Sequence, residues 1–368
     1  MTEKTPVTLE AGVPLEQQSG RPPRRKAFSR AGVQRVFAVS EAGIVISLVA
    51  LVLIFNSLQS AFLSSQNVRA MLGAMSFVAI IAVGQTLLLI AGEFDLSVGS
   101  VAGLSAVISA WLMTKGHLPV PIALLLGIGS GGAVGLINGL VVVRLGIPAF
   151  IATLGMLYAA QGFDLLLTNG YPIYPLPHSV GKIGQATPLF GIGWSFYILV
   201  VLVVVADLVL RRTTIGRNLY ATGGNREIAR LVGINTDLYK IVCFVLTGML
   251  AALAGMLVMG SLASGSTSIG SGWELIVIAG VVIGGVSLFG GVGSVAAGFV
   301  GMLLLQVVQS GLVVVGVSPN WQTVSVGVIM VAAVGLDLFR RKVSARDSIR
   351  RRRARGSTLH ETEEAGAM

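Results

Sequence analysis

The sequence predicts an all-α polytopic membrane protein with about ten transmembrane helices, some of them broken or re-entrant. Hydrophobic residues make up 54% of the chain and charged residues only 11%, and the mean hydropathy is +0.84. Soluble domains contain about 25% charged residues, so this composition is typical of a membrane protein. The only cysteine, Cys243, excludes a disulfide or a cysteine metal site within one chain.

Ten apolar segments are long enough to cross a bilayer, which takes about 20 residues in a helix. Their approximate bounds are 42–60, 71–91, 97–114, 119–143, 148–168, 191–210, 239–262, 273–290, 292–315 and 320–339. We expect a transmembrane domain over 42–340, between a basic, disordered tail over 1–41 and a charged tail over 341–368. The first tail is too long to be the charged part of a cleavable signal.

Basic residues predict the orientation. Six lie within 21–35 and nine within 340–355, and others occur at Arg144 and in the loop 211–240. Because Lys and Arg are enriched in cytoplasmic loops, we expect both tails and this loop in the cytoplasm, and the protein in a bacterial inner membrane. The tails adjoin apolar spans, so membrane lipid rather than nucleic acid is their expected partner. The stretch 169–185 is then an external ordered loop or re-entrant cap.

Two carboxylates interrupt the apolar runs within Gly92–Ser100. A charge in such surroundings costs a few kcal/mol unless it is paired or hydrated. Two interpretations remain open: Asp95, with Glu93, accepts hydrogen bonds from a hydroxylated solute, or Asp95 caps the following helix with help from Ser97. The expected position near the cytoplasmic face favours the cap. The complete set of candidate pathway or anchor residues is Glu93, Asp95, Ser97, Asn138 and Glu274.

Glycines are concentrated in the apolar segments, where small residues allow helices to approach closely. The five residues of 98–102, VGSVA, recur at 292–296. Transporters often contain weak internal repeats with interrupted helices, but a match of this length also arises by chance.

The loop 211–240 is predicted to contain a short helix. Asn225 is the expected N-cap, Glu227 lies in the first turn, where the helix dipole favours an acid, and Gly233 ends the helix. A short surface helix of this kind suits docking into a groove of another protein. A solvated or lipid-surface loop is the alternative.

Several separated motifs resemble the permeases of ribose-type, carbohydrate-uptake ABC importers over residues 60–340. They are D-L-S-V-G at 95–99, I-P-x-F-I-A-T-L-G at 147–155, G-R-x-x-Y-A-x-G-G-N at 216–225, A-R-L-x-G-I-N at 229–235, G-x-E-L at 272–275, V-V-I-G-G at 281–285 and G-x-G-S at 291–294. Glu93 and Phe94 depart from the family pattern, in which smaller or aliphatic residues are common.

The resemblance implies that the loop helix is a coupling helix seated on a separate ABC ATPase, that the pore lies between two permease copies, and that an extracytoplasmic binding protein delivers a monosaccharide or polyol. It assigns coupling to Gly216, Arg217, Tyr220, Gly223, Gly224, Asn225, Arg226, Glu227, Ala229, Arg230 and Gly233. The sequence contains no G-x-x-x-x-G-K-[ST] phosphate loop, so we expect ATP and Mg²⁺ on the partner chain and no cofactor on this one.

Two other classes of protein are less consistent with the sequence. A secondary transporter has no reason to contain the family's loop motif at 216–235. An intramembrane enzyme needs a catalytic constellation, but His117, His178 and His360 have no metal-ligand spacing. We therefore expect a transporter subunit rather than an enzyme.

Overall fold

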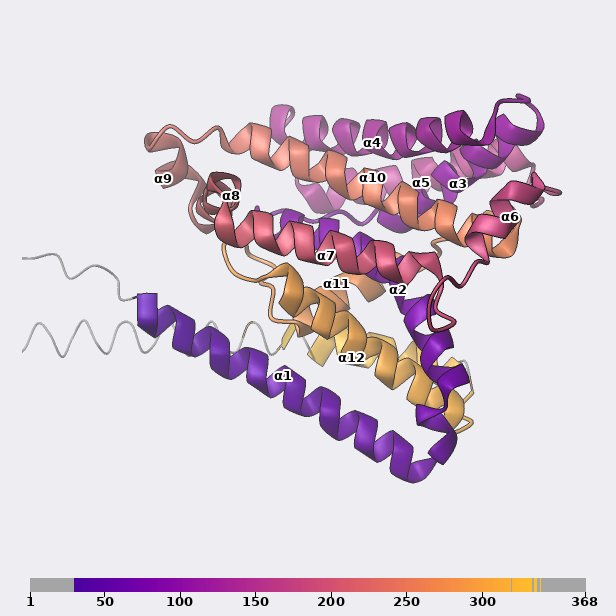
Figure 1. Ribbon diagram of the computed structural model, residues 1–368. Helices are drawn as coiled ribbons and strands as arrows, with labels where there is room; N and C mark the ends of the chain where they lie inside the picture. Colours follow the sequence, from indigo (N-terminus) through magenta and orange to yellow (C-terminus); the bar gives the residue numbers. More distant parts are fainter. Residues whose placement is uncertain (1–29, 319, 333, 336–337, 339–368) are drawn as a thin grey trace, which may run out of the picture. The chain divides into compact units, whose positions relative to one another are not determined.

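The computed structural model describes residues 30–318, 320–332, 334–335 and 338. Within these residues every regular element is a helix, and strand-like pairing is confined to two isolated bridges. The elements are α1 (Arg30–Leu58), the 3-10 helix η1 (Ser60–Leu63), α2 (Ser65–Ile90), α3 (Val98–Thr114), α4 (Val120–Arg144), α5 (Ala149–Thr168), α6 (His178–Gly184), α7 (Trp194–Arg212), α8 (Thr214–Gly224), α9 (Arg226–Leu231), α10 (Thr236–Leu262), α11 (Trp273–Ile283) and α12 (Val295–Val314) (Figure 1).

Among the described residues, six helices are long and apolar enough to cross a bilayer, namely α2, α4, α5, α7, α10 and α12. Three shorter apolar helices are Gly43–Leu58 within α1, α3 and α11. The 11 residues of α11 extend only about 16 Å, too little to cross the hydrocarbon core. The all-α polytopic class is confirmed, whereas ten spans are not, and part of 320–339 lies outside the described residues.

The predicted N-terminal tail, 1–41, extends too far along the sequence. α1 begins at Arg30, so residues 30–41 are helical and do not belong to a disordered tail. No proline follows Pro23 in this stretch, so nothing breaks the helix before the apolar residues that it precedes. Residues 1–29 and 339–368 lie outside the described part. The chain divides into two units, Met1–Val39 and Ser40–Met368, and the candidate site lies entirely in the second.

α10 is the central helix of this second unit. It packs against α2, α3 and most extensively α4, which lies beside it in Figure 1. Glycines permit the close approach: a Cβ atom on Gly248 would overlap the backbone of Gly131 in α4, and one on Gly255 would overlap Ala102 in α3. α8 and α9 lie at the N-terminal end of α10, the α9 end. α6 contacts the other end, the α6 end, where Gly184 abuts Gly260.

The chain between α10 and α12 is a broken helix, as expected for part of the transmembrane domain. Residues 263–272 are not regular helix and run back along α3. Cβ atoms added to α3 would meet this segment at two places, at Gly103 beside the Ile269 carbonyl and at Gly99 beside the Gly270 carbonyl. α11 starts only after this segment, so the predicted span 273–290 is helical over its first part alone.

The two VGSVA segments occupy different positions at their helices. Residues 98–102 form the first turn of α3. The second copy begins three residues before α12, whose first residue is Val295. The sequence match therefore does not superimpose equivalent helix positions.

Candidate functional site

Asp95 lies in the turn between α2 and α3 and is fully buried. Its Oδ1 accepts hydrogen bonds from the Ser97 backbone N–H at 2.7 Å and the Ser97 hydroxyl at 2.6 Å. Its Oδ2 accepts one from the Asn138 side-chain amide of α4 at 3.2 Å. Asn138 also donates to the Ser97 hydroxyl at 3.0 Å. The structure thus brings together three predicted candidates, Asp95, Ser97 and Asn138.

The turn is held by α5 as well, because the Leu96 backbone N–H donates to the Thr153 hydroxyl at 3.1 Å. Asp95 accepts the N–H two residues on, as in a capping interaction, but this N–H belongs to Ser97, the N-cap of α3, rather than to the helix proper. Buried polar groups that satisfy one another in this way stabilise one arrangement of the surrounding segments. The geometry is that of an anchor.

Glu93, at the start of the same turn, forms an ion pair with Lys240 near the start of α10. Lys240 Nζ lies 2.5 Å from Glu93 Oε1, and both side chains are largely buried. Removing one partner of such a pair leaves an uncompensated charge. The pair therefore fixes the turn to the α9 end of α10. Lys240 was not among the predicted site residues, because a lysine at the start of an apolar span is also typical of a cytoplasmic flank.

Three glycine-containing segments meet beside this turn. A Cβ atom on Gly223, at the end of α8, would overlap the carbonyl oxygen of Ile90 at the end of α2. The Gly291 backbone N–H donates to the same carbonyl at 2.9 Å. Gly290 packs on Gly92. Only a hydrogen side chain fits at Gly223, so α8 contacts the polar turn through backbone.

α8 is fixed to the transmembrane helices by other coupling candidates. Gly216 is buried against Leu210, and the Tyr220 hydroxyl donates to the Gly293 carbonyl at 2.6 Å. Burial raises the pKa of the Tyr220 phenol, and the nearby Asp207 carboxylate adds to the shift while Arg211 opposes it. The phenol stays protonated and able to donate. Arg217 and Gly224, in contrast, are exposed.

α9 has the caps that the sequence predicts. The Asn225 side chain accepts from the Ile228 backbone N–H at 3.0 Å. At the other end Gly233 has φ +84; its N–H donates to the Arg230 carbonyl, and that of Ile234 to the Ala229 carbonyl, both at 3.0 Å. This pair of bonds is a Schellman motif.

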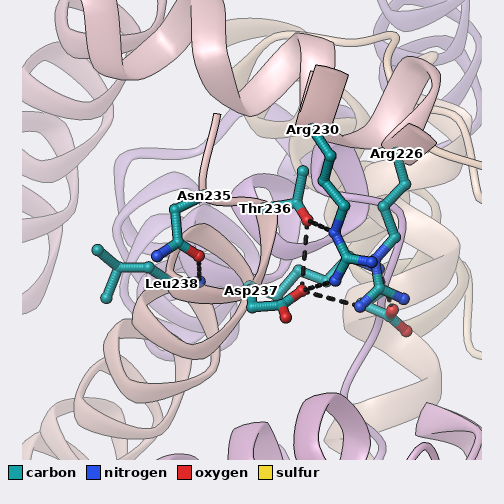
Figure 2. Close-up of polar contacts among 8 residues, drawn as sticks. Arg226, Arg230, Asn235, Thr236, Asp237 and Leu238 are labelled. Atoms are coloured by element: carbon teal, nitrogen blue, oxygen red, sulfur yellow. Dashed lines mark hydrogen bonds and ion pairs between the residues drawn. The ribbon is translucent and has the colours of Figure 1, made fainter. Parts of the chain in front are cut away.

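Charged side chains fasten α9 to α10. Figure 2 shows Arg226 and Arg230 converging on Asp237 in the first turn of α10, with nitrogen–oxygen distances of 2.8 and 2.6 Å. Arg230 also donates to the Thr236 hydroxyl at 3.0 Å. Two caps and two ion pairs make this short helix a rigid projection.

One coupling candidate faces the wrong way for docking. Ala229 is only 2% exposed and packs within its own chain, so the prediction that it meets a partner is wrong. The exposed apolar side chains are Ile228, Leu231 and Val232, of which Leu231 is 86% exposed. These positions share one helical face, and Ala229 is turned about 100° from it. Glu227 is exposed in the first turn.

Glu274 is separate from the Asp95 cluster. It lies in the first turn of α11, and a Cβ atom on Gly99 would lie 2.5 Å from its Oε2. A second carboxylate, Asp164 of α5, lies one turn further along α3, 3.4 Å from a Cβ atom on Gly103. Asp164 was not among the predicted site residues, although an aspartate inside an apolar span indicates a functional position.

The family model for the branched-chain amino acid transport system / permease component matches residues 67–334. The chain belongs to this family. The permease is 35% identical to the autoinducer 2 import system permease protein of Photorhabdus luminescens over 298 residues, which cover 79% of this chain and 88% of that protein. It is 34% identical over 296 residues to the ribose import permease protein of Escherichia coli K12, with 79% and 92% covered.

A third relative is the L-arabinose ABC transporter permease protein of Azospirillum brasilense, which is 33% identical over 315 residues covering 86% of this permease and 92% of that protein. No solved structure matches the permease. The relatives are subunits of ABC importers, so the resemblance found in the sequence is confirmed, and the chain is a transporter subunit rather than an enzyme.

Proposed function

We propose that this permease moves a monosaccharide or small polyol into the cytoplasm and that a separate ABC ATPase drives the movement. The named solutes of the similar permeases include ribose and L-arabinose, which supports a small polyhydroxylated solute. Pentose, hexose, deoxysugar and polyol are all compatible with these relatives.

The observation that carries the proposal is the exposed apolar face of α9 on a rigidly held helix. Ile228 and Leu231 lie on a six-residue helix whose two ends are capped, and Val232 is its C-cap residue; all three side chains are exposed. A small apolar projection fits a groove on a partner protein, and a rigid one transmits the partner's motion. Here the partner is the ATPase, which binds ATP and Mg²⁺, while this chain binds no cofactor.

A path for the motion leads from α9 into the transmembrane part. Arg226 and Arg230 contact Asp237 at the start of α10. One turn later Lys240 pairs with Glu93 in the turn that Asp95 anchors. A displacement of α9 would therefore move α10 and the 93–97 turn together.

The orientation follows from the same helices. Arg211 and Arg212 end α7 beside α8, and Arg217 is exposed on α8. Basic residues favour the cytoplasmic side, so we place the α9 end in the cytoplasm and the α6 end outside a bacterial inner membrane. A second permease copy completes the pore, and an extracytoplasmic binding protein delivers the solute to the α6 end.

Leu231→Asp tests the docking role, with Leu231→Met as the matched control. The aspartate places an unpaired charge on a face that becomes buried in the complex, whereas methionine keeps the face apolar. We expect co-purification of Leu231→Asp with the ATPase subunit to fall about tenfold or more, because a buried unpaired charge costs several kcal/mol. ATP-dependent uptake should fall by a similar factor. Unchanged association and uptake in Leu231→Asp would refute docking through α9.

A further inference from the structure

The non-helical segment 263–272 lies well inside the bundle. Ala102 packs on Gly255, seven residues before the end of α10, and Gly99 is three residues further from that end. At 1.5 Å per residue, Gly270, which contacts Gly99, lies about 15 Å inside the α6 end. Irregular backbone at such a depth has hydrogen-bonding groups that lipid tails do not satisfy. It occurs only where protein buries it or water reaches it.

Part of this segment is not buried by the chain itself. Ile269 and Gly270 are buried against α3, whereas Ser268, Ser271 and Gly272 are exposed. Ser266 and Ser268 hydrogen-bond to each other, with 2.9 Å between their hydroxyl oxygens. The exposed residues are two serines and a glycine, in contrast to exposed apolar residues such as Val201 of α7. Water on this face accounts for both the composition and the exposed backbone.

Two carboxylates accompany the polar segment. Glu274 follows it directly in α11, and its Oε2 lies beside Gly99. Asp164 of α5 lies beside Gly103, one turn along the same face of α3. Asp164 is only 4% exposed, and its Oδ1 is buried with no hydrogen-bond partner among the described residues. A buried carboxylate oxygen without a donor is costly. Because this oxygen has almost no accessible surface in the conformation described, we expect the donor to reach it in another state of the transport cycle, when the helices around it move apart.

The donor set of the surroundings restricts the chemistry of that molecule. α3, α5, α11 and 263–272 contain no Lys, Arg or His. An anionic solute would meet two carboxylates with no basic residue from these elements and would be repelled. Hydroxyl groups, in contrast, donate hydrogen bonds to carboxylates and carry no charge.

We propose that Asp164, Glu274 and the segment 266–272 form the wall of a water-filled solute pathway, and that the two carboxylates accept hydrogen bonds from the hydroxyl groups of a neutral polyhydroxylated solute. This proposal rests on the transport function proposed above and identifies where the solute passes. It separates these residues from the Asp95 cluster, whose acceptors are already occupied by groups of the protein.

Cysteine accessibility tests the water-filled wall in membranes containing the assembled importer. Ser268→Cys and Ser271→Cys are made separately on a Cys243→Ser background and treated with a positively charged, membrane-impermeant methanethiosulfonate. Val201→Cys is the matched control, because Val201 is 60% exposed in the isolated chain but lies on an apolar face of α7. Thiols react as thiolates, which need water, so we expect both serine positions to react about tenfold faster than position 201.

Equal, slow reaction at positions 201, 268 and 271, with Tyr171→Cys in the loop after α5 labelled normally, would overturn the proposal. Such a result would mean that lipid or a second copy covers the segment. The labelling needs no ATP, so it is independent of whether an ATPase drives transport. If uptake depends on ATP but positions 268 and 271 are not labelled, the importer function is still supported and only the proposed pathway is refuted.

Asp164→Asn and Glu274→Gln test the role of the carboxylates. Both keep the shape of the side chain and replace one acceptor oxygen by a donor. We expect unchanged co-purification of each variant with the ATPase. Uptake of the sugar that the wild-type importer accumulates should fall about tenfold or more in each variant, the loss typical of one displaced charged hydrogen bond. Uptake of the wild-type level in both variants would refute their contact with the solute.

Discussion

Asp95 and Asp164 are both buried aspartates among apolar helices, yet their surroundings differ. Asp95 receives hydrogen bonds from Ser97 and Asn138 on both of its oxygens. Asp164 has an oxygen that is buried without a partner among the described residues. Proteins rarely leave a buried polar atom unpaired unless it has a function. The comparison therefore separates an aspartate that holds the structure together from one that is available to a solute.

The difference arises from where each residue lies. Asp95 is in a turn, where a free backbone N–H and a nearby hydroxyl are present, and Asn138 approaches it from α4. Asp164 lies one turn before the end of α5, and the residue of α3 beside it is Gly103, which has no side-chain donor. The carboxylate of Asp95 therefore accepts hydrogen bonds on both oxygens, whereas that of Asp164 can still accept one.

The largest effect is expected from breaking the satisfied cluster. Asp95→Leu leaves the backbone N–H and the hydroxyl of Ser97 without their acceptor and removes one of the two acceptors of the Asn138 amide. It should lower the free energy of unfolding by about 3–5 kcal/mol. Asp95→Asn keeps one acceptor oxygen and should cost less. Asp164→Leu removes no hydrogen bond made by the protein and should leave stability unchanged or raise it.

Thermal unfolding of the purified permease in detergent compares these three variants. Equal destabilisation by Asp95→Leu and Asp164→Leu would contradict the distinction between the two aspartates.

A somewhat smaller loss is expected where α8 packs on the anchored turn. A Cβ atom at Gly223 would overlap the Ile90 carbonyl, whereas one at Gly224 would have nothing within 4 Å. Gly223→Ala should therefore destabilise the protein by about 2–3 kcal/mol and Gly224→Ala hardly at all. Yield and unfolding temperature measure both. Tolerance of alanine at Gly223 would show that α8 does not press against this turn.

A double-mutant cycle on Glu93 and Lys240 tests whether the turn is linked to α10. Glu93→Lys and Lys240→Glu each place two like charges together, and the double variant restores opposite charges at the two positions that form the ion pair. We expect an interaction energy of about 1–3 kcal/mol between the two substitutions. ATP-dependent uptake should fall in both single variants and recover in the double one. Additive losses would mean that the pair does not connect these elements.

Local features of the site were predictable from the sequence, and long-range ones were not. The caps Asn225 and Gly233 depend on neighbouring residues, so the residue types alone indicated them. Asn138 was recognised as a candidate, but its contact with Asp95 joins residues 43 positions apart. The orientation of Ala229 depends on how α9 meets α10, which no local pattern specifies.

The prediction of a continuous span over 273–290 was wrong for a different reason. Apart from Glu274 and Ser287 these residues are apolar or glycine, and hydropathy gives no indication of where a helix is broken. Six glycines have positive φ here and allow the chain to leave helical geometry. Two precede Trp273, Gly270 and Gly272, and four follow α11, Gly285, Gly290, Gly291 and Gly293. The sequence shows the glycines but not the conformations that they adopt.

The smallest effect on stability belongs to the pathway carboxylates. Asp164→Asn and Glu274→Gln should change the unfolding temperature little. Among the described residues no other side chain donates to either carboxylate, and the bond of Glu274 is to its own backbone, which a glutamine oxygen also accepts. Their effect should appear in uptake instead. Unfolding temperature in detergent and uptake rate are measured on the same preparations. We expect a normal unfolding temperature with reduced uptake, and a loss of stability that accounts for the loss of uptake would contradict this expectation.

Solute accumulation in proteoliposomes tests most directly that a separate ATPase drives this permease. The permease is reconstituted with or without the ATPase subunit, ATP is enclosed, and binding protein loaded with labelled ribose, L-arabinose or galactose is added outside. We predict accumulation above the external concentration for at least one sugar, only when both the ATPase and ATP are present. Accumulation or equilibration of a sugar by the permease alone would contradict the account.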